Sequence, residues 1–255
     1  MPLSVQLGLV CAVLTALSSV VGFFLKHKGA IQVPPVRWRQ PVRSFVALFR
    51  SPVFVLGCAV DAMSWGFRIA ALALAPISVV QAITAGGLVL ITVLGDRVFG
   101  QVVSRREWIG VALTAVGLAF LAATLQGTVD DAHSDYREPV LAAVLIASTA
   151  AALLLIARGR TGPALAVAAG LLWAGADITI KALSDHGGLG LGVLTHPFML
   201  LIAVWSLAGL LVSARSLQLG PVVPVASLTA ASANTLTIAS GPTVFGEPLP
   251  EDPAA

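Results

Sequence analysis

The sequence has 255 residues, of which 57% are hydrophobic and only 11% are charged, and its mean hydropathy is +0.94. Soluble domains carry about 25% charged residues, so this chain has too few polar side chains to cover a soluble surface of its size. The composition therefore excludes a soluble globular protein and indicates a polytopic membrane protein with the lipid bilayer as its surroundings. The net charge of +3 does not indicate a nucleic-acid partner, because the basic residues cluster between apolar runs.

Eight apolar runs are candidates to cross the roughly 30 Å hydrocarbon layer as helices that rise 1.5 Å per residue. In chain order the expected spans are residues 3–25, 53–71, 77–94, 109–125, 139–157, 163–183, 197–214 and 221–244. The first span has basic residues after it and none before it, so it is interpreted as a retained helix and not as a cleaved signal peptide.

The segments between the spans differ in character. Residues 26–50 are basic and contain several prolines, so they are expected to form a loop or surface stretch. Residues 126–138 are acidic, and residues 185–196 are rich in glycine. Cys11 and Cys58 both fall inside apolar runs, where packing is a better interpretation than a disulfide.

The basic residues predict the orientation of the chain, because cytoplasmic loops carry an excess of Lys and Arg. Placing the first loop inside puts 12 of the 15 basic residues on that side, namely Lys26, Lys28, Arg37, Arg39, Arg43, Arg50, Arg97, Arg105, Arg106, Arg158, Arg160 and Arg215. This assignment places both termini outside, and we expect a multi-pass protein of the cell (plasma) membrane.

An internal sequence repeat relates the two halves of the chain. Pro76 opens a run that ends in Gly95-Asp96, and Pro221 opens a run that ends in Gly246-Glu247. The two runs are five spans apart, and an odd offset makes the halves antiparallel, as in transporters built from inverted repeats. The expected fold is therefore an all-α bundle of about eight transmembrane helices in two inverted repeats. Residues 1–125 form the first half, 126–162 an acidic external loop with a linking span, and 163–255 the second half.

Several motifs resemble the drug/metabolite transporter superfamily, including its EamA-like members. They are Ala75-Pro76, Gly95-Asp96-Arg97, Glu107-Trp108-Ile109-Gly110, Gly220-Pro221 and Gly246-Glu247. The basic stretch Lys26-His27-Lys28-Gly29 after the first span is similar to the branch that contains the NIPA-type magnesium transporters and their actinobacterial relatives.

The resemblance implies a secondary transporter or permease of small metabolites or ions that works by alternating access, with magnesium as the alternative substrate. The superfamily pattern has one more span after the Gly-Glu motif, so the second half is expected to be truncated before a final span. The alternative that follows from this expectation is a non-transporting membrane remnant or partner subunit. A homodimer that supplies the absent helix is compatible with either function.

Charged residues inside spans are costly in a bilayer, by about 2.5–3.5 kcal/mol on insertion scales, and they mark candidate functional sites. Asp61 and Asp177 are the two acidic residues inside expected spans. Arg68 follows Asp61 by seven residues and Lys181 follows Asp177 by four, so each is a candidate ion-pair partner on the same helix face. The two interpretations are a substrate, cation or proton site, and an ion pair that holds spans together.

Polar residues in two spans complete the candidate set. Gln81 and Asn234 are candidate substrate contacts, with Thr84, Ser232 and Thr235 near them in sequence. Interhelical hydrogen bonding by these side chains is the favoured alternative. The histidines show no metal-ligand spacing, and the chain has no Walker loop and no catalytic constellation. The sequence thus predicts neither an enzyme nor a cofactor, and it leaves any metal unidentified.

Overall fold

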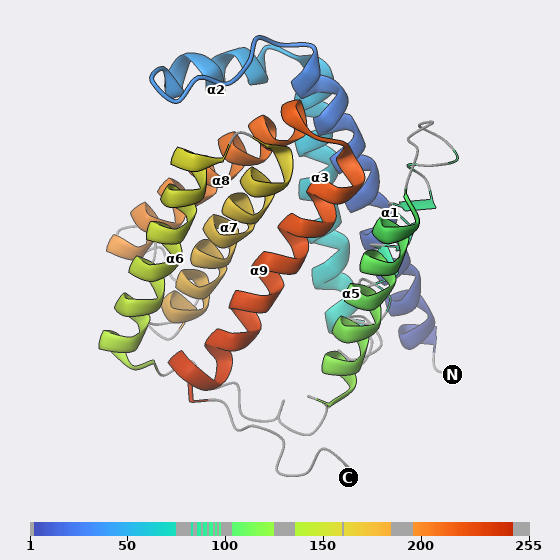
Figure 1. Cartoon of the computed structure of the whole chain (residues 1–255). Helices are drawn as coiled ribbons and strands as arrows, with labels where there is room; N and C mark the ends of the chain where they lie inside the picture. Colours follow the sequence, from blue (N-terminus) through green and yellow to red (C-terminus); the bar gives the residue numbers. More distant parts are fainter. Residues whose placement is uncertain are drawn as a thin grey trace. The chain divides into compact units, whose positions relative to one another are not determined.

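The structure is a computed structural model that describes residues 3–74, 104–124, 136–159, 161–184 and 196–246, with isolated positions between 83 and 97. Within these ranges every regular secondary-structure element is an α-helix, and no strand occurs (Figure 1). The helices are α1 (Leu3–Ile31), α2 (Pro41–Phe49), α3 (Pro52–Leu74), α5 (Arg105–Thr124), α6 (Glu138–Arg158), α7 (Gly162–Ser184), α8 (Pro197–Leu219) and α9 (Val222–Val244).

The described helices confirm an all-α membrane protein with several spans. Five of them are long and apolar enough to cross a bilayer, and a sixth qualifies if α2 and α3 count as one bent span. Seven of the eight expected spans coincide with a described helix. The eighth, residues 77–94, lies largely outside the described residues, and the inverted repeat and the three-part division of the chain stay predictions.

Prolines explain where many of these helices begin. Pro41, Pro139 and Pro197 occupy the first or second position of α2, α6 and α8, where the missing backbone N–H removes no intrahelical hydrogen bond. The C-terminal end of α9 is determined by Gly246, whose φ is 65°. This left-handed conformation commonly ends helices, and glycine adopts it without strain.

Two sequence-based boundaries were wrong in the same way. The first helix was expected to end at residue 25 but continues to Ile31, and α8 continues past residue 214 to Leu219. Lys26 and Arg215, which were assigned to loops, therefore lie inside helices. Long basic side chains are compatible with the last turns of a membrane helix because their stems pack against apolar surface while the charge reaches polar surroundings.

The segment from residue 26 to residue 50 was expected to be a loop or surface stretch, and this expectation also needs correction. Its beginning belongs to α1, and residues 41–49 form the short helix α2. Prolines and arginines made the segment resemble a loop. They are compatible with a helix here because Pro41 stands at the first helical position, where proline is tolerated.

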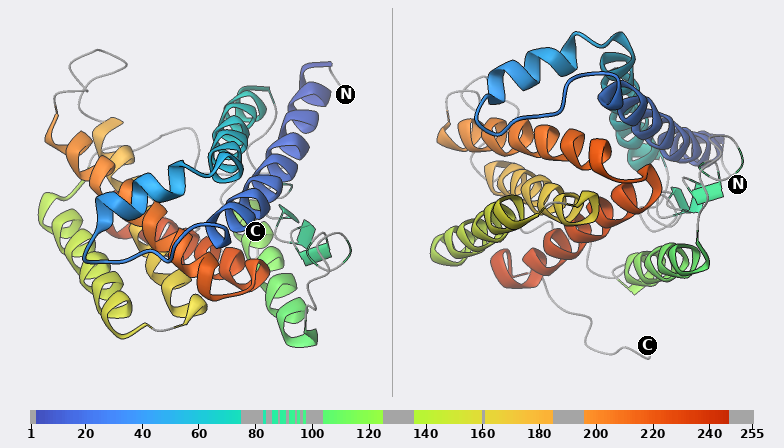
Figure 2. Two further views of the ribbon diagram at one scale, coloured as in Figure 1. Left: turned by 90° about the horizontal axis from the view of Figure 1, so that it is seen from above. Right: turned by 45° about the horizontal axis from the view of Figure 1, so that its top comes forward.

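The chain divides into two compact units. The first comprises residues 1–129, 221–227 and 252–255, and the second comprises residues 130–220 and 228–251. In the first unit α1 packs along α3, and in the second α7 packs against both α6 and α8 (Figure 2). The core of the second unit contains Leu165, Ala169, Leu172 and Trp205, all nearly inaccessible to solvent.

Candidate functional site

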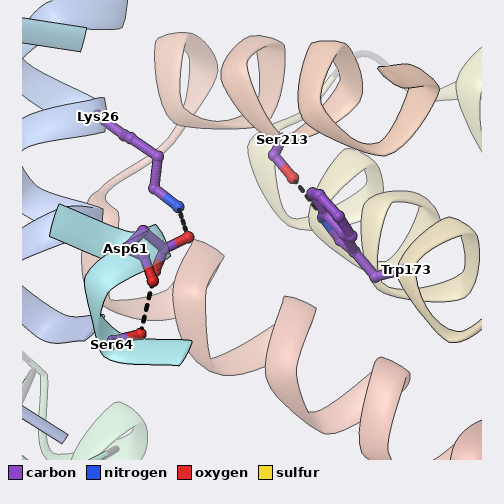
Figure 3. A network of polar contacts seen from close by, with 5 residues as sticks. All are labelled: Lys26, Asp61, Ser64, Trp173 and Ser213. Carbon is purple, nitrogen blue, oxygen red and sulfur yellow. Dashed lines mark hydrogen bonds and ion pairs between the residues drawn. The ribbon is translucent and has the colours of Figure 1, made fainter. Parts of the chain in front are cut away.

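Asp61 forms an ion pair between two helices of the first unit. The Nζ atom of Lys26 on α1 lies 2.7 Å from Oδ2 of Asp61 on α3 (Figure 3). Asp61 is nine residues from the start of α3 at Pro52, which is about 13 Å along the helix axis. A single charge at such a depth in a bilayer is unfavourable, so the opposite charges of Lys26 and Asp61 stabilise each other.

Glycines bring the two helices close enough for this pair to form. A Cβ atom added to Gly57 would lie 2.6 Å from the backbone nitrogen of Lys26 and 2.9 Å from its Cγ atom. A Cβ atom added to Gly22 would lie 3.1 Å from that of Asp61, and one on Gly29 would overlap the backbone of Phe54. The side chain of Lys26 therefore crosses α3 over Gly57, and small residues permit this close approach, as is common between membrane helices.

The two charged groups differ in their accessibility. The Lys26 side chain is 11% exposed and that of Asp61 is 37% exposed. The ammonium group also lies 4.5 Å from the centroid of the Phe23 ring, which is a favourable cation–π distance. The hydroxyl of Ser64 donates a hydrogen bond of 2.7 Å to the backbone carbonyl of Asp61, not to its carboxylate. The carboxylate is therefore the more accessible member of the pair.

The other candidate residues have different surroundings. Asp177 and Asn234 are exposed positions of α7 and α9 in the second unit. The Nζ atom of Lys181 lies 4.4 Å from the ring centroid of Phe245. Gln81 and the side chain of Arg68 lie outside the described residues. Asp61 thus pairs with a basic residue of another helix of the first unit.

Sequence reasoning missed Lys26 because it considered partners on the same helix only. Lys26 and Asp61 are 35 residues apart, so their pairing depends on the crossing of α1 with α3. A signal was present in the glycine pattern, since Gly22, Lys26 and Gly29 share one face of α1, and Gly57 and Asp61 share one face of α3. Small residues three or four positions from a charged residue in each of two spans indicate a close crossing at that level.

Several hydrogen bonds in the second unit join neutral groups of neighbouring helices. The indole nitrogen of Trp173 on α7 donates a hydrogen bond of 3.3 Å to the hydroxyl of Ser213 on α8 (Figure 3). The hydroxyl of Thr229 on α9 donates to the carbonyl of Ala166 on α7 at 3.2 Å. Ser232, a candidate for a polar cavity, donates at 2.7 Å to the carbonyl of Leu228 in its own helix. These contacts fit interhelical and backbone bonding by small polar residues.

An open groove of about 420 Å³ lies in the second unit beside α7 and α9. It is lined by Val167, Leu171, Leu228, Ala231, Ser232, Thr235, Leu236 and Ala239. This lining is mainly apolar, and no group of three or more His, Cys, Asp or Glu side chains lies together in the part of the chain that the structure describes.

Comparison with known proteins supports a relationship to a transporter. Over 109 residues the chain is 29% identical to a protein of Arabidopsis thaliana described as the probable magnesium transporter NIPA9. The matched segment covers 42% of this chain and 31% of that protein, so the chain spans about a third of the relative's length. No protein-family model matches the chain, and no solved structure matches it significantly. The apolar helices and this relative together indicate a multi-pass membrane protein related to transporters.

Proposed function

We propose that the chain is a secondary transporter that moves small cations or cationic metabolites across the membrane by alternating access. The observation that carries this proposal is the Lys26–Asp61 ion pair, a carboxylate within an apolar helix bundle whose neutralising partner comes from a neighbouring span. Ionisable residues in such positions commonly mark substrate or ion pathways. The sequence contains no Walker loop, so a substrate gradient or a coupled ion is the proposed energy source.

The proposed role of Lys26 is that of a tethered cation that occupies Asp61 when no substrate is bound. A substrate cation that reaches the more exposed carboxylate competes with the ammonium group for the same oxygen atoms. Lys26 stands five residues before the end of α1 at Ile31, so its flexible side chain can move its charge toward the helix end when it is displaced. The carboxylate then keeps an opposite charge beside it both with and without substrate.

Magnesium is the first substrate that we propose, because the curated relative is described as a probable magnesium transporter. Magnesium binds carboxylate oxygens and retains several of its waters. A single carboxylate such as Asp61 is compatible with a hydrated ion. A cationic metabolite is the alternative substrate, because its ammonium group can form the same charge-assisted hydrogen bond with Asp61.

Transport by the purified chain in sealed liposomes tests the proposal. We would follow magnesium entry with an entrapped fluorescent indicator, and entry of radiolabelled cationic metabolites in parallel. Wild-type protein should exceed empty liposomes, and Asp61→Asn should reduce uptake by at least about ten-fold because a charge-assisted contact is lost. Ser64→Ala is the matched control, since the hydroxyl of Ser64 donates to the backbone carbonyl of Asp61 and not to its carboxylate, and it should transport as wild type.

The variant Lys26→Gln distinguishes competition by the ammonium group from a purely structural ion pair. Competition predicts a lower KM for the substrate cation, because the carboxylate no longer has to be released from Lys26. A purely structural pair predicts an unchanged KM in the folded fraction of the protein. Wild-type uptake by Asp61→Asn would remove Asp61 from the site, and absence of transport for every cation tested would contradict the proposed function.

A further inference from the structure

The short helix α2 is oriented across the direction of a membrane span. The axes of α2 and the first part of α3 differ by 86° at the break between Phe49 and Pro52 (Figure 1). If α3 crosses the bilayer, a helix nearly perpendicular to it runs parallel to the membrane surface. The preceding helix α1 is itself a candidate span that ends at Ile31, so α2 is connected to the bilayer on both sides and lies at the level of the lipid headgroups.

The outward face of α2 is apolar. Val42, Val46 and Phe49 recur at intervals of four and three residues, which places them on one face of the helix, and all three are exposed, Val42 by 76%. The opposite face is buried through Ser44 and Leu48. An exposed apolar stripe is unfavourable in water but favourable where it enters the boundary between headgroups and acyl chains, as interfacial amphipathic helices do.

Basic side chains border this stripe. Residues 27–60 contain Lys28, Arg37, Arg39, Arg43 and Arg50 and no acidic residue. All four of these arginines are exposed, and Arg43 and Arg50 are seven residues apart, so they share a line along the helix next to the apolar stripe. This arrangement attracts negative charge, and the exposed Trp38 is a residue type that favours the membrane interface.

Local contacts hold α2 at its angle. The backbone N–H of Arg37 donates a hydrogen bond of 3.0 Å to the hydroxyl of Ser44, which ties the basic turn to the helix. The ring of Phe49 stacks on Phe45 with centroids 4.5 Å apart and meets Phe54 of α3 edge-on at 5.9 Å. These contacts extend across the bend, so the apolar stripe and the arginines are presented together on one fixed surface.

We propose that residues 37–50, here termed the α2 surface, form a docking site for the headgroups of anionic phospholipids in the adjacent leaflet. Val42, Val46 and Phe49 enter the acyl-chain boundary, while Arg39, Arg43 and Arg50 contact headgroup phosphates, which arginine binds with two parallel hydrogen bonds. The α2 surface thereby selects anionic lipids as neighbours of the protein. This proposal does not depend on the substrate that the chain transports.

Lipid enrichment around the full chain in mixed bilayers tests the binding. A fluorophore attached near α2 would report energy transfer from labelled phosphatidylglycerol or labelled phosphatidylcholine, each at the same low fraction. We expect wild-type protein to enrich phosphatidylglycerol. Each basic side chain near an anionic surface contributes about five-fold to attraction, so Arg39→Gln with Arg43→Gln should reduce the enrichment by roughly thirty-fold.

The matched control removes the same charge elsewhere. Arg105 and Arg106 are also exposed neighbouring arginines, but they lie at the start of the long helix α5. Arg105→Gln with Arg106→Gln should keep most of the enrichment. Equal loss in both double variants, or equal transfer from the two lipids in wild-type protein, would overturn the proposal. Displacement of phosphatidylglycerol by millimolar inorganic phosphate would also overturn it, because it would indicate a site for free phosphate.

Depth measurements test the apolar stripe separately. In a background with Cys11→Ser and Cys58→Ser, spin labels at Val42→Cys and Val46→Cys should be reached by oxygen more readily than by a water-soluble nickel chelate. A label at Gln32→Cys, an exposed polar position between α1 and α2, should show the reverse. Water-like accessibility at positions 42 and 46 would show that α2 does not enter the interface.

Discussion

The contact between α1 and α3 and the contacts of α7 stabilise polar groups in opposite ways. The first places an ammonium group 2.7 Å from a carboxylate where glycines let the helices approach closely. The second uses neutral donors: the indole N–H of Trp173 donates to the hydroxyl of Ser213 at 3.3 Å (Figure 3). The hydroxyl of Ser216 likewise donates to the carbonyl of Gly162 at 2.7 Å. A neutral contact that is lost leaves a dipole without a partner, whereas a lost ionic contact leaves a full charge.

The ionic contact between α1 and α3 and the neutral contacts of α7 suggest different roles for these two regions. Neutral hydrogen bonds between membrane helices contribute little individually, and those of Trp173 and Ser216 join α7 to α8 through uncharged groups. Either charge of the Lys26–Asp61 pair would be unfavourable without the other. A cation that replaces Lys26 at Asp61 therefore changes the contact between α1 and α3. Under the proposed function, the Lys26–Asp61 contact is the one that responds to cations, while the neutral hydrogen bonds hold α7 to α8.

The largest predicted effect comes from removing one charge of the pair. Removing one partner of a buried ion pair typically costs 3–5 kcal/mol, and because Asp61 is partly exposed we expect Lys26→Met to lower the free energy of unfolding by about 2–3 kcal/mol. Unfolding in mixed micelles with increasing SDS measures this quantity. Lys26→Met combined with Asp61→Asn should restore most of the loss. Additive losses in the double variant would show that the two charges do not interact.

Glycine substitutions test the close approach of neighbouring helices at a glycine, which occurs in both regions. Gly57→Ala places a Cβ atom 2.6 Å from the backbone of Lys26, and Gly170→Ala places one 2.5 Å from the carbonyl of Thr229. Both variants should unfold more readily by about 1–3 kcal/mol, the usual cost of overpacking.

The control for these variants is Gly66→Ala in α3, where nothing lies within 4 Å of an added Cβ atom. Alanine favours a helix over glycine by about 0.8–1.0 kcal/mol, so this variant should be neutral or slightly stabilising in the same micelle assay. A cost at Gly66 equal to that at Gly57 would mean that the close approach of α1 and α3 is not what makes Gly57 necessary.

The smallest predicted effect is in the hydrogen bonds between neutral groups of α7 and α8. Trp173→Phe removes the donor to Ser213 and keeps most of the ring, so we expect a loss of about 0.6 kcal/mol, the average for such bonds between membrane helices. A double-mutant cycle with Ser213→Ala measures the coupling in the same mixed micelles. A coupling as large as that of Lys26 with Asp61 would remove the distinction between the two regions.

The sequence predicted the helices well because hydropathy reports lipid contact directly. Its errors occurred where polar residues belong to helices. Lys26 and Arg215 ended the expected spans too early, although their long side chains allow both residues to stay helical. The helix α2 was missed because the prolines and arginines of residues 26–50 suggested a loop. The pattern of Val42, Val46 and Phe49 that indicates an amphipathic helix covers only two turns.

The candidate site was predicted in part. Asp61 was identified from its charge within an apolar run, which requires only the sequence. Its partner was not identified, because pairing with Lys26 depends on how α1 crosses α3, and hydropathy contains no information about crossings. The functional roles of Asp61, Asp177, Gln81 and Asn234 all stay predictions. The repeat that begins at Pro76 and at Pro221 also stays a prediction, because only a superposition of the two segments can test it.

The packing of α7 has a consequence for the biosynthesis of the protein. Of its apolar window 61% is buried within the protein, against 22% for α6 and for α8, and α7 is less apolar than α6. A segment that leaves the ribosome is sorted by its own affinity for lipid, and α7 also contains Asp177 and Lys181, which oppose insertion. We therefore expect α7 to enter the bilayer efficiently only after α6, which precedes it in synthesis, offers a protein surface inside the membrane.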